Sequence, residues 1–155
     1  MSINNEIFGE LEYDYIWYKD IEIEFLGKKN KIVLMVDGDE DGEFEEEQYI
    51  AYKILMEKWN GLQDILLQEI LNYYNVIRHE LGYDIEINEE YPLIETIQEL
   101  VKNIKLAGIV IPYSGAYDGR ECGITFDCTW DDENGIGVCL VDEKVVEIGY
   151  QDIVM

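Results

Sequence analysis

The spacing of apolar residues changes along this 155-residue chain, and this change constrains the fold more than any other feature of the sequence. Residues 21–25 alternate between apolar and acidic side chains, which is the pattern of a half-buried strand. Residues 31–36 form a continuous apolar run, which is typical of a more central strand, and residues 27–30 form a turn between the two. The N-terminal part is therefore predicted to form a β-hairpin.

Helical spacing of apolar residues follows the hairpin. Three segments have this spacing: residues 49–59, 62–81 and 93–104. Asn60-Gly61 is expected to break or kink the helix between the first two segments, and Gly82 is expected to end the second. The sequence thus predicts two to three helices.

The last third of the chain returns to alternation with a period of two, in residues 124–130, 136–140 and 146–150. Loops at residues 131–135 and 142–144 would place Trp130 opposite Ile136 and Leu140 opposite Val146. All the alternating apolar side chains then share one face of a sheet. We expect one α+β domain over residues 1–155, with an N-terminal β-hairpin, two to three helices and a C-terminal antiparallel three-stranded meander.

The net charge of −24 excludes several classes of partner. The chain's apolar content of 48% is enough for a hydrophobic core, so the charge does not indicate disorder. Nucleic acid and anionic membranes are poor partners, because each phosphate contact would need cations that this surface lacks. The acidic start is unlike a basic signal peptide, no apolar run approaches a membrane helix, and the three cysteines have no zinc spacing. These features predict a cytoplasmic protein with small, buried cysteines.

Residues that could carry catalysis are sparse. His79 is the single histidine, and the two serines, Ser2 and Ser114, have no nucleophile motif around them. The glycines of residues 115–119 lack the spacing and the lysine of a phosphate-binding loop. We therefore expect a protein without enzymatic activity and without a cofactor.

Residues 37–42 match the start of a calcium loop, D-x-D-x-D-G. The twelfth position is Gln48 instead of a bidentate glutamate, and a strand precedes the loop instead of a helix. The alternative is a strand-to-helix turn whose carboxylates stabilise the start of the next helix. Both interpretations stay open, and no metal ligands are assigned.

Two acidic clusters and one tyrosine-containing loop are the candidate partner-binding residues. Residues 111–120 form a long loop with two tyrosines, and tyrosine is a common interface anchor. The predicted partner-binding residues are Asp37, Asp39, Glu40, Asp41, Tyr113, Tyr117, Asp131, Asp132 and Glu133.

Several segments resemble a group of small acidic bacterial domains of unknown function that look like immunity proteins of toxin systems. They are residues 8–11 (FGEL), the Asp41-Gly42 turn with residues 46–48 and 51–52, residues 126–131 and 135–138, and residues 146–152. The resemblance implies a binding protein and brings no catalytic motif.

The leading hypothesis is an immunity protein that neutralises a cognate toxin, plausibly a nuclease, by occluding its basic surface. A first alternative is a phage-encoded nucleic-acid mimic that inhibits a host defence nuclease. A second alternative is a calcium-binding module.

Overall fold

The computed structural model describes residues 1–84 and 88–155. Within these two ranges the strands are β1 (Ser2–Asn5), β2 (Gly9–Asp14), β3 (Ile16–Phe25), β4 (Lys28–Val36), β5 (Ile104–Ile111), β6 (Glu121–Cys128), β7 (Ile136–Val141) and β8 (Lys144–Gly149). The helices are α1 (Glu46–Glu80), the single-turn α2 (Ile97–Leu100) and the C-terminal 3₁₀ turn η1 (Gln151–Val154).

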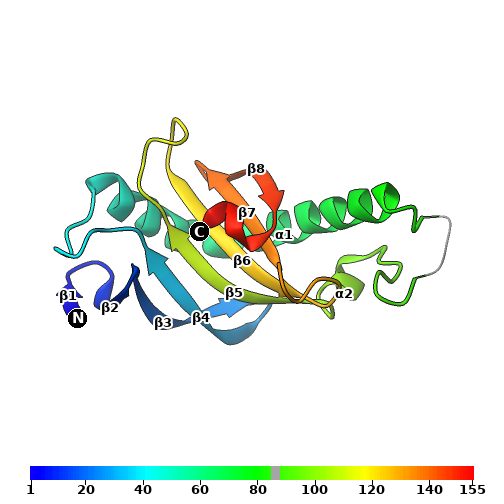
Figure 1. Ribbon diagram of the computed structural model, residues 1–155, viewed down its shortest axis with the longest axis horizontal. Coiled ribbons are helices and arrows are strands. Elements are labelled where there is room, and N and C mark those ends of the chain that lie inside the picture. The colour runs from blue at the N-terminus through cyan, green and yellow to red at the C-terminus, as the bar shows by residue number, and fades with distance from the viewer. Residues whose placement is uncertain (85–87) are drawn as a thin grey trace.

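The strands form one sheet in sequence order, from β1 at one edge to β8 at the other. Neighbouring strands are antiparallel except for β4 and β5, which are parallel. A parallel pair needs a crossover connection, and α1 with α2 supplies it (Figure 1). The loops that follow β4 and β5 consequently lie side by side, at the same end of the strands.

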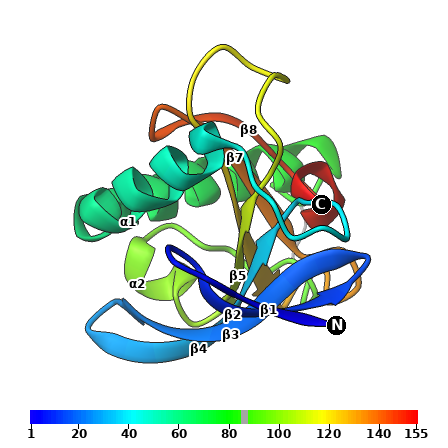
Figure 2. The same ribbon diagram turned by 90° about the vertical axis from the view of Figure 1, so that its left-hand side faces the viewer.

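The long helix α1 packs on one face of the sheet, and η1 packs on the other (Figure 2). The buried side chains of α1 form one stripe along the helix: Gln48, Ala51, Leu55, Trp59, Leu62, Gln63, Leu66, Leu67, Ile70, Leu71, Tyr74 and Arg78. On the opposite face, Gly123 and Gly137 leave room for η1, because a Cβ atom at Gly123 would lie 2.6 Å from the Cβ of Val154. Strand β6 is therefore covered on both faces, by α1 and by η1.

The predicted fold class is wrong. The structure is an eight-stranded sheet with, among the described residues, one long helix, and it has strands at both ends of the chain. The expected break at Asn60-Gly61 is absent, because the buried stripe continues from Trp59 to Leu62 across the exposed Gly61. Burying those two side chains outweighs the cost of about 1 kcal/mol for a glycine inside a helix.

The predicted third helix over residues 93–104 is also wrong. Its helical part is limited to α2, which Thr96 caps by accepting a hydrogen bond from the Glu99 N–H at 3.2 Å. Asn103 closes the turn by donating to the Glu99 carbonyl at 3.0 Å, and β5 starts at Ile104.

The C-terminal meander is part of the larger sheet, and the register of its first pair differs from the prediction. Ile136 pairs with Phe126 instead of Trp130, a shift of four residues that leaves the same side chains on the same face. Val138 does pair with Ile148, and a bulge then places Leu140 opposite Val145. Residues 129–135 form the loop, so Trp130 lies outside the strand.

Candidate partner-binding site

The predicted acidic loop at residues 37–41 and the tyrosine loop at residues 112–120 come together at one end of the sheet, where β4 and β5 finish. Each loop follows the carboxyl end of a parallel strand, β4 or β5. The Tyr113 N–H donates to Oδ2 of Asp37 at 3.4 Å, and the Tyr113 hydroxyl donates to Oδ1 of Asp39 at 3.3 Å. The structure therefore places Tyr113 against the first acidic cluster.

Asp37 differs from the other acids of this loop, because it is half-buried. Burial raises the pKa of the Asp37 carboxyl, and the hydrogen bond from the Tyr113 backbone opposes that rise. Asp39, Glu40 and Asp41 are exposed, and the Asp39 carbonyl accepts a hydrogen bond from the Trp17 indole at 2.8 Å. Three of the four predicted acids thus face outward from a loop that is fixed to the sheet.

Tyr117 reaches across the same surface to β8, where its hydroxyl lies 3.4 Å from Oε2 of Glu147. Asp37, Tyr113 and Tyr117 line a shallow cavity of about 170 Å³ together with the C-terminal Val154 and Met155. The structure therefore groups six of the nine predicted residues at this end of the sheet: Asp37, Asp39, Glu40, Asp41, Tyr113 and Tyr117.

The calcium-like residues 37–48 serve the fold. Gln48, at the twelfth position, is buried, and its amide donates to the Asp37 carbonyl at 2.8 Å and to the Ile111 carbonyl at 3.3 Å. These bonds tie the start of α1 to the ends of β4 and β5. In residues 1–84 and 88–155 no three His, Cys, Asp or Glu side chains lie together as metal ligands.

The second acidic cluster, Asp131, Asp132 and Glu133, lies at the opposite end of the sheet. It follows β6, whereas the tyrosine loop precedes β6, so the length of this strand separates the two clusters by roughly 25 Å. Asp131 is half-buried and accepts hydrogen bonds from the Asn134 N–H and side-chain amide, at 3.2 Å and 3.0 Å. Asp132 and Glu133 are exposed.

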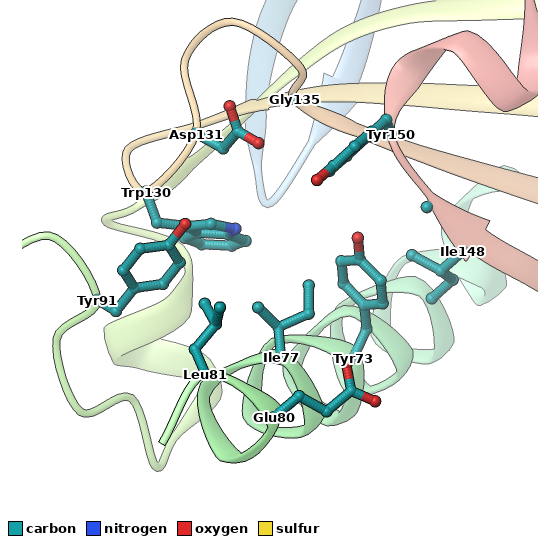
Figure 3. Close-up of a pocket in the computed structure, with 11 residues that line it drawn as sticks. Tyr73, Ile77, Glu80, Leu81, Tyr91, Trp130, Asp131, Gly135, Ile148 and Tyr150 are labelled. Atoms are coloured by element: carbon teal, nitrogen blue, oxygen red, sulfur yellow. The ribbon is translucent and has the colours of Figure 1, made fainter. Parts of the chain in front are cut away.

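An open pocket of about 430 Å³ lies beside this second cluster, and we call it the aromatic pocket. Figure 3 shows Trp130 and Tyr91 on one side, Tyr73 and Tyr150 on the other, and between them Ile77 of α1 and Leu81, which directly follows the helix. Asp131 lies across the pocket from the helix, and Glu80 lies at its edge (Figure 3).

Buried side chains of α1 fix the walls of the aromatic pocket. The Tyr74 ring packs on Trp130 with a centroid separation of 4.3 Å, and its hydroxyl donates to the Pro92 carbonyl at 2.6 Å. Arg78 donates to the Tyr91 carbonyl at 2.9 Å and to the Tyr83 carbonyl at 2.8 Å. Trp130 and Tyr91 are thus held in place by the helix.

The surroundings of the pocket are negative. Burial is the main cause that raises the pKa of Tyr73 to about 12, and the charges of Asp131 and Glu80 add to it. Burial also raises the pKa of Tyr91, again with a contribution from Asp131. The described lining contains no lysine or arginine. A cationic group would find aromatic rings and uncompensated negative charge in the same place.

The sequence pattern did not predict this pocket. The helical spacing of residues 62–81 predicted Tyr73, Ile77 and Leu81 on the buried face, broadened by Tyr74, but at that end of α1 the buried positions are Tyr74 and Arg78. This rotation of α1 leaves Tyr73 and Ile77 half-buried and Leu81 exposed. Trp130 is buried, as its alternating pattern predicted. The signal in the sequence was the number of tyrosines, 12 in 155 residues, because tyrosine is enriched at binding surfaces.

The nucleophilic and basic groups considered from the sequence lie apart. His79 is exposed, and its Nδ1 lies 2.7 Å from Asp84. Cys122 and Cys128 are buried as predicted, and burial raises their thiol pKa values to about 12 and about 11. Cys139 is half-buried. Both buried thiols are neutral at physiological pH.

Fold and site together define an acidic protein with a helix-covered, eight-stranded sheet and aromatic and acidic surfaces at its two ends. The chain matches the family described as "Domain of unknown function (DUF6985)" over residues 7–155, and it belongs to this family. No curated protein and no solved structure matches it significantly. In the described ranges no helix has the length and apolar character needed to cross a membrane.

Proposed function

We propose that this chain is a non-enzymatic cytoplasmic immunity protein, which binds a basic toxin domain such as a nuclease and occludes its cationic surface. One observation carries the proposal: the fold leaves most of its negative charge without an internal counterion. The chain has 35 acidic residues, and ion pairs with lysine or arginine in the described ranges involve three of them: Asp20, Asp142 and Glu143.

An enzyme that cleaves nucleic acid presents a cationic cleft to phosphates, and a rigid acidic surface can occupy the same cleft. Long-range attraction increases the rate of encounter, whereas desolvated anchors govern dissociation. In this chain the exposed acids Asp39, Glu40 and Asp41 would provide attraction. Tyr113 and Tyr117, each more than 40% exposed, would provide anchors at the same end of the sheet.

The test is a pull-down with the protein encoded by the neighbouring gene, followed by measurement of the dissociation constant against NaCl concentration. We expect the dissociation constant to rise at least about tenfold between 50 and 500 mM NaCl, because salt screens exposed charges. A salt-independent complex would contradict the proposed mechanism.

Matched charge reversals identify the surface that binds. Glu40→Lys with Asp41→Lys removes acids from the first cluster, and Asp132→Lys with Glu133→Lys removes acids from the second. Glu57→Lys with Asp64→Lys makes the same change in net charge on the exposed side of α1. At least one cluster variant should weaken binding by more than tenfold relative to the α1 variant. Equal effects of all three would mean that net charge alone is responsible.

A further inference from the structure

We propose that the aromatic pocket binds an arginine side chain of the basic protein partner. This inference deepens the proposed function, and it rests on that function for the nature of the partner. The juxtaposition that carries it is four aromatic side chains around an open cavity of about 430 Å³, with two carboxylates and no basic group in the described lining.

The arrangement of the rings suits a flat cation. Trp130 and Tyr91 lie on one side of the pocket and Tyr73 and Tyr150 on the other, so a group that enters between the two pairs meets aromatic side chains from both sides (Figure 3). A cation held near the face of tryptophan or tyrosine is attracted by the ring quadrupole, and the attraction strengthens when water is excluded.

The carboxylates supply the charge that a cation needs. Asp131 already accepts hydrogen bonds from Asn134, but those donors are neutral amides, so its negative charge is not compensated. The nearby Arg78 is buried, donates to the carbonyls of Tyr83 and Tyr91, and among the described residues forms no ion pair with Asp131 or Glu80. A positive side chain from a partner would therefore bind where the chain has left negative charge.

Arginine fits this environment better than lysine. Its guanidinium is planar, stacks on aromatic rings, and donates several hydrogen bonds in a fixed plane to carboxylate and hydroxyl oxygens. The hydroxyls of Tyr73 and Tyr150 point toward each other on one side of the pocket, where they can accept such bonds (Figure 3). The ammonium of lysine would gain the charge attraction but little of the stacking.

One wall of the pocket is held in place by buried side chains, which favours a specific occupant. Tyr74 and Arg78 are buried, and their bonds to the carbonyls of Pro92, Tyr91 and Tyr83 hold the loop that carries Tyr91. Pre-ordered walls lower the entropy cost of binding a side chain. Tyr150 is half-exposed at the mouth and is free to contact the partner as well.

The test uses the full chain and Nα-acetyl-arginine amide at constant ionic strength, with the indole N–H signals of the three tryptophans recorded by NMR. Trp17 and Trp59 are internal controls, because their indole N–H groups donate to the backbone carbonyls of Asp39 and Glu24, outside the pocket. We expect a saturable shift of the Trp130 signal and none at Trp17 or Trp59. Nα-acetyl-citrulline amide, which has the same shape without the charge, should give no saturable shift.

Variants of the pocket separate a specific site from general attraction to an acidic protein. Tyr150→Leu keeps apolar bulk and should raise the dissociation constant about tenfold. Glu80→Gln should raise it two- to threefold, whereas Glu57→Gln, on the exposed side of the same helix, should leave it unchanged. Glu80 and Glu57 are both exposed, so neither change threatens folding.

Three results would overturn the inference: equal shifts with citrulline amide, parallel shifts of all three tryptophans, or equal effects of Glu80→Gln and Glu57→Gln. Equal shifts with Nα-acetyl-lysine amide would overturn the choice of arginine. This experiment needs no partner protein, so its failure leaves the salt-dependent complex of the proposed function standing. Conversely, if no salt-dependent complex with a toxin forms, the NMR titration still shows whether the pocket binds arginine amide.

Discussion

Glu143 shows how one side chain can join three parts of the fold. Its side chain is 5% exposed, although it occupies a turn position with a φ of 60° between β7 and β8. It accepts hydrogen bonds from Nζ of Lys58 on α1 at 3.0 Å, and from the Arg120 guanidinium at 2.7 Å and 3.1 Å. The hydrogen bonds from Arg120, followed by those from Lys58, hold the pKa of Glu143 below its usual range.

Replacing this carboxylate should destabilise the protein in a pH-dependent way. A lowered pKa in the folded state contributes stability above the ordinary glutamate pKa of about 4.3, and the contribution disappears as pH falls through the folded value. We expect Glu143→Gln to cost about 1–3 kcal/mol at pH 7 and less at pH 3, measured by urea unfolding. Asp142→Asn is the control, because Asp142 is half-exposed and asparagine tolerates its positive φ. A loss for Glu143→Gln that is equal at both pH values would refute the role of the charge.

At the level of elements, the helix α1 contains a glycine that its packing does not need. A Cβ atom at Gly61 would meet no atom within 4 Å. Gly61→Ala should therefore stabilise the protein by about 0.5–1 kcal/mol, since alanine loses less backbone freedom in a helix. Gly82→Ala should destabilise it, because Gly82 follows the helix with a φ of 82°. Thermal unfolding of both variants tests this, and a destabilised Gly61→Ala would indicate that the helix bends at this position.

The turn η1 depends on a glycine in the strand beneath it. A Cβ atom at Gly137 would lie 2.6 Å from the carbonyl oxygen of Tyr150, whereas one at Gly149 would lie 3.3 Å from the Ile153 side chain. Gly137→Ala should cost about 1–3 kcal/mol and speed amide exchange in residues 151–155, because the turn must move away. Gly149→Ala should have the smaller effect in both measurements. Equal effects would mean that the turn is not held by close packing at Gly137.

The elements also show which parts of the fold the sequence could reveal. The hairpin of β3 and β4 and the helical spacing over residues 49–81 were visible, because each has one buried face with a clear period. Strand β5 was missed because it is buried on both faces beyond Leu106, and such a run lacks alternation. Strand β1 was missed because it is a short, polar edge strand.

The candidate site, like the fold, could be predicted from the sequence only in part. The acidic loop and Tyr113 were found, because charge and tyrosine in loops are local signals. The aromatic pocket was not found, because it depends on a small rotation of α1 that buries Tyr74 fully and Tyr73 only in part. Such a rotation follows from packing against the whole sheet, which a helical period does not define.

At the scale of the whole molecule, the charge of −24 acts on stability as well as on binding. Uncompensated like charges repel one another in the compact state, and salt screens that repulsion within a Debye length of about 10 Å at 0.1 M. We expect the thermal midpoint to rise by about 3–6 °C between 10 and 150 mM NaCl, and then to level off.

The levelling separates charge screening from a general salt effect. Exclusion of salt from the surface would continue to stabilise the protein up to molar concentrations. The variant with Glu57→Lys and Asp64→Lys carries less net charge and should show a smaller rise over the same range, measured by scanning calorimetry. A midpoint that does not change with NaCl would mean that the fold spaces its carboxylates widely enough to avoid mutual repulsion. In that case the same charges would also attract a basic partner less than the net value suggests, because the local potential would be weak.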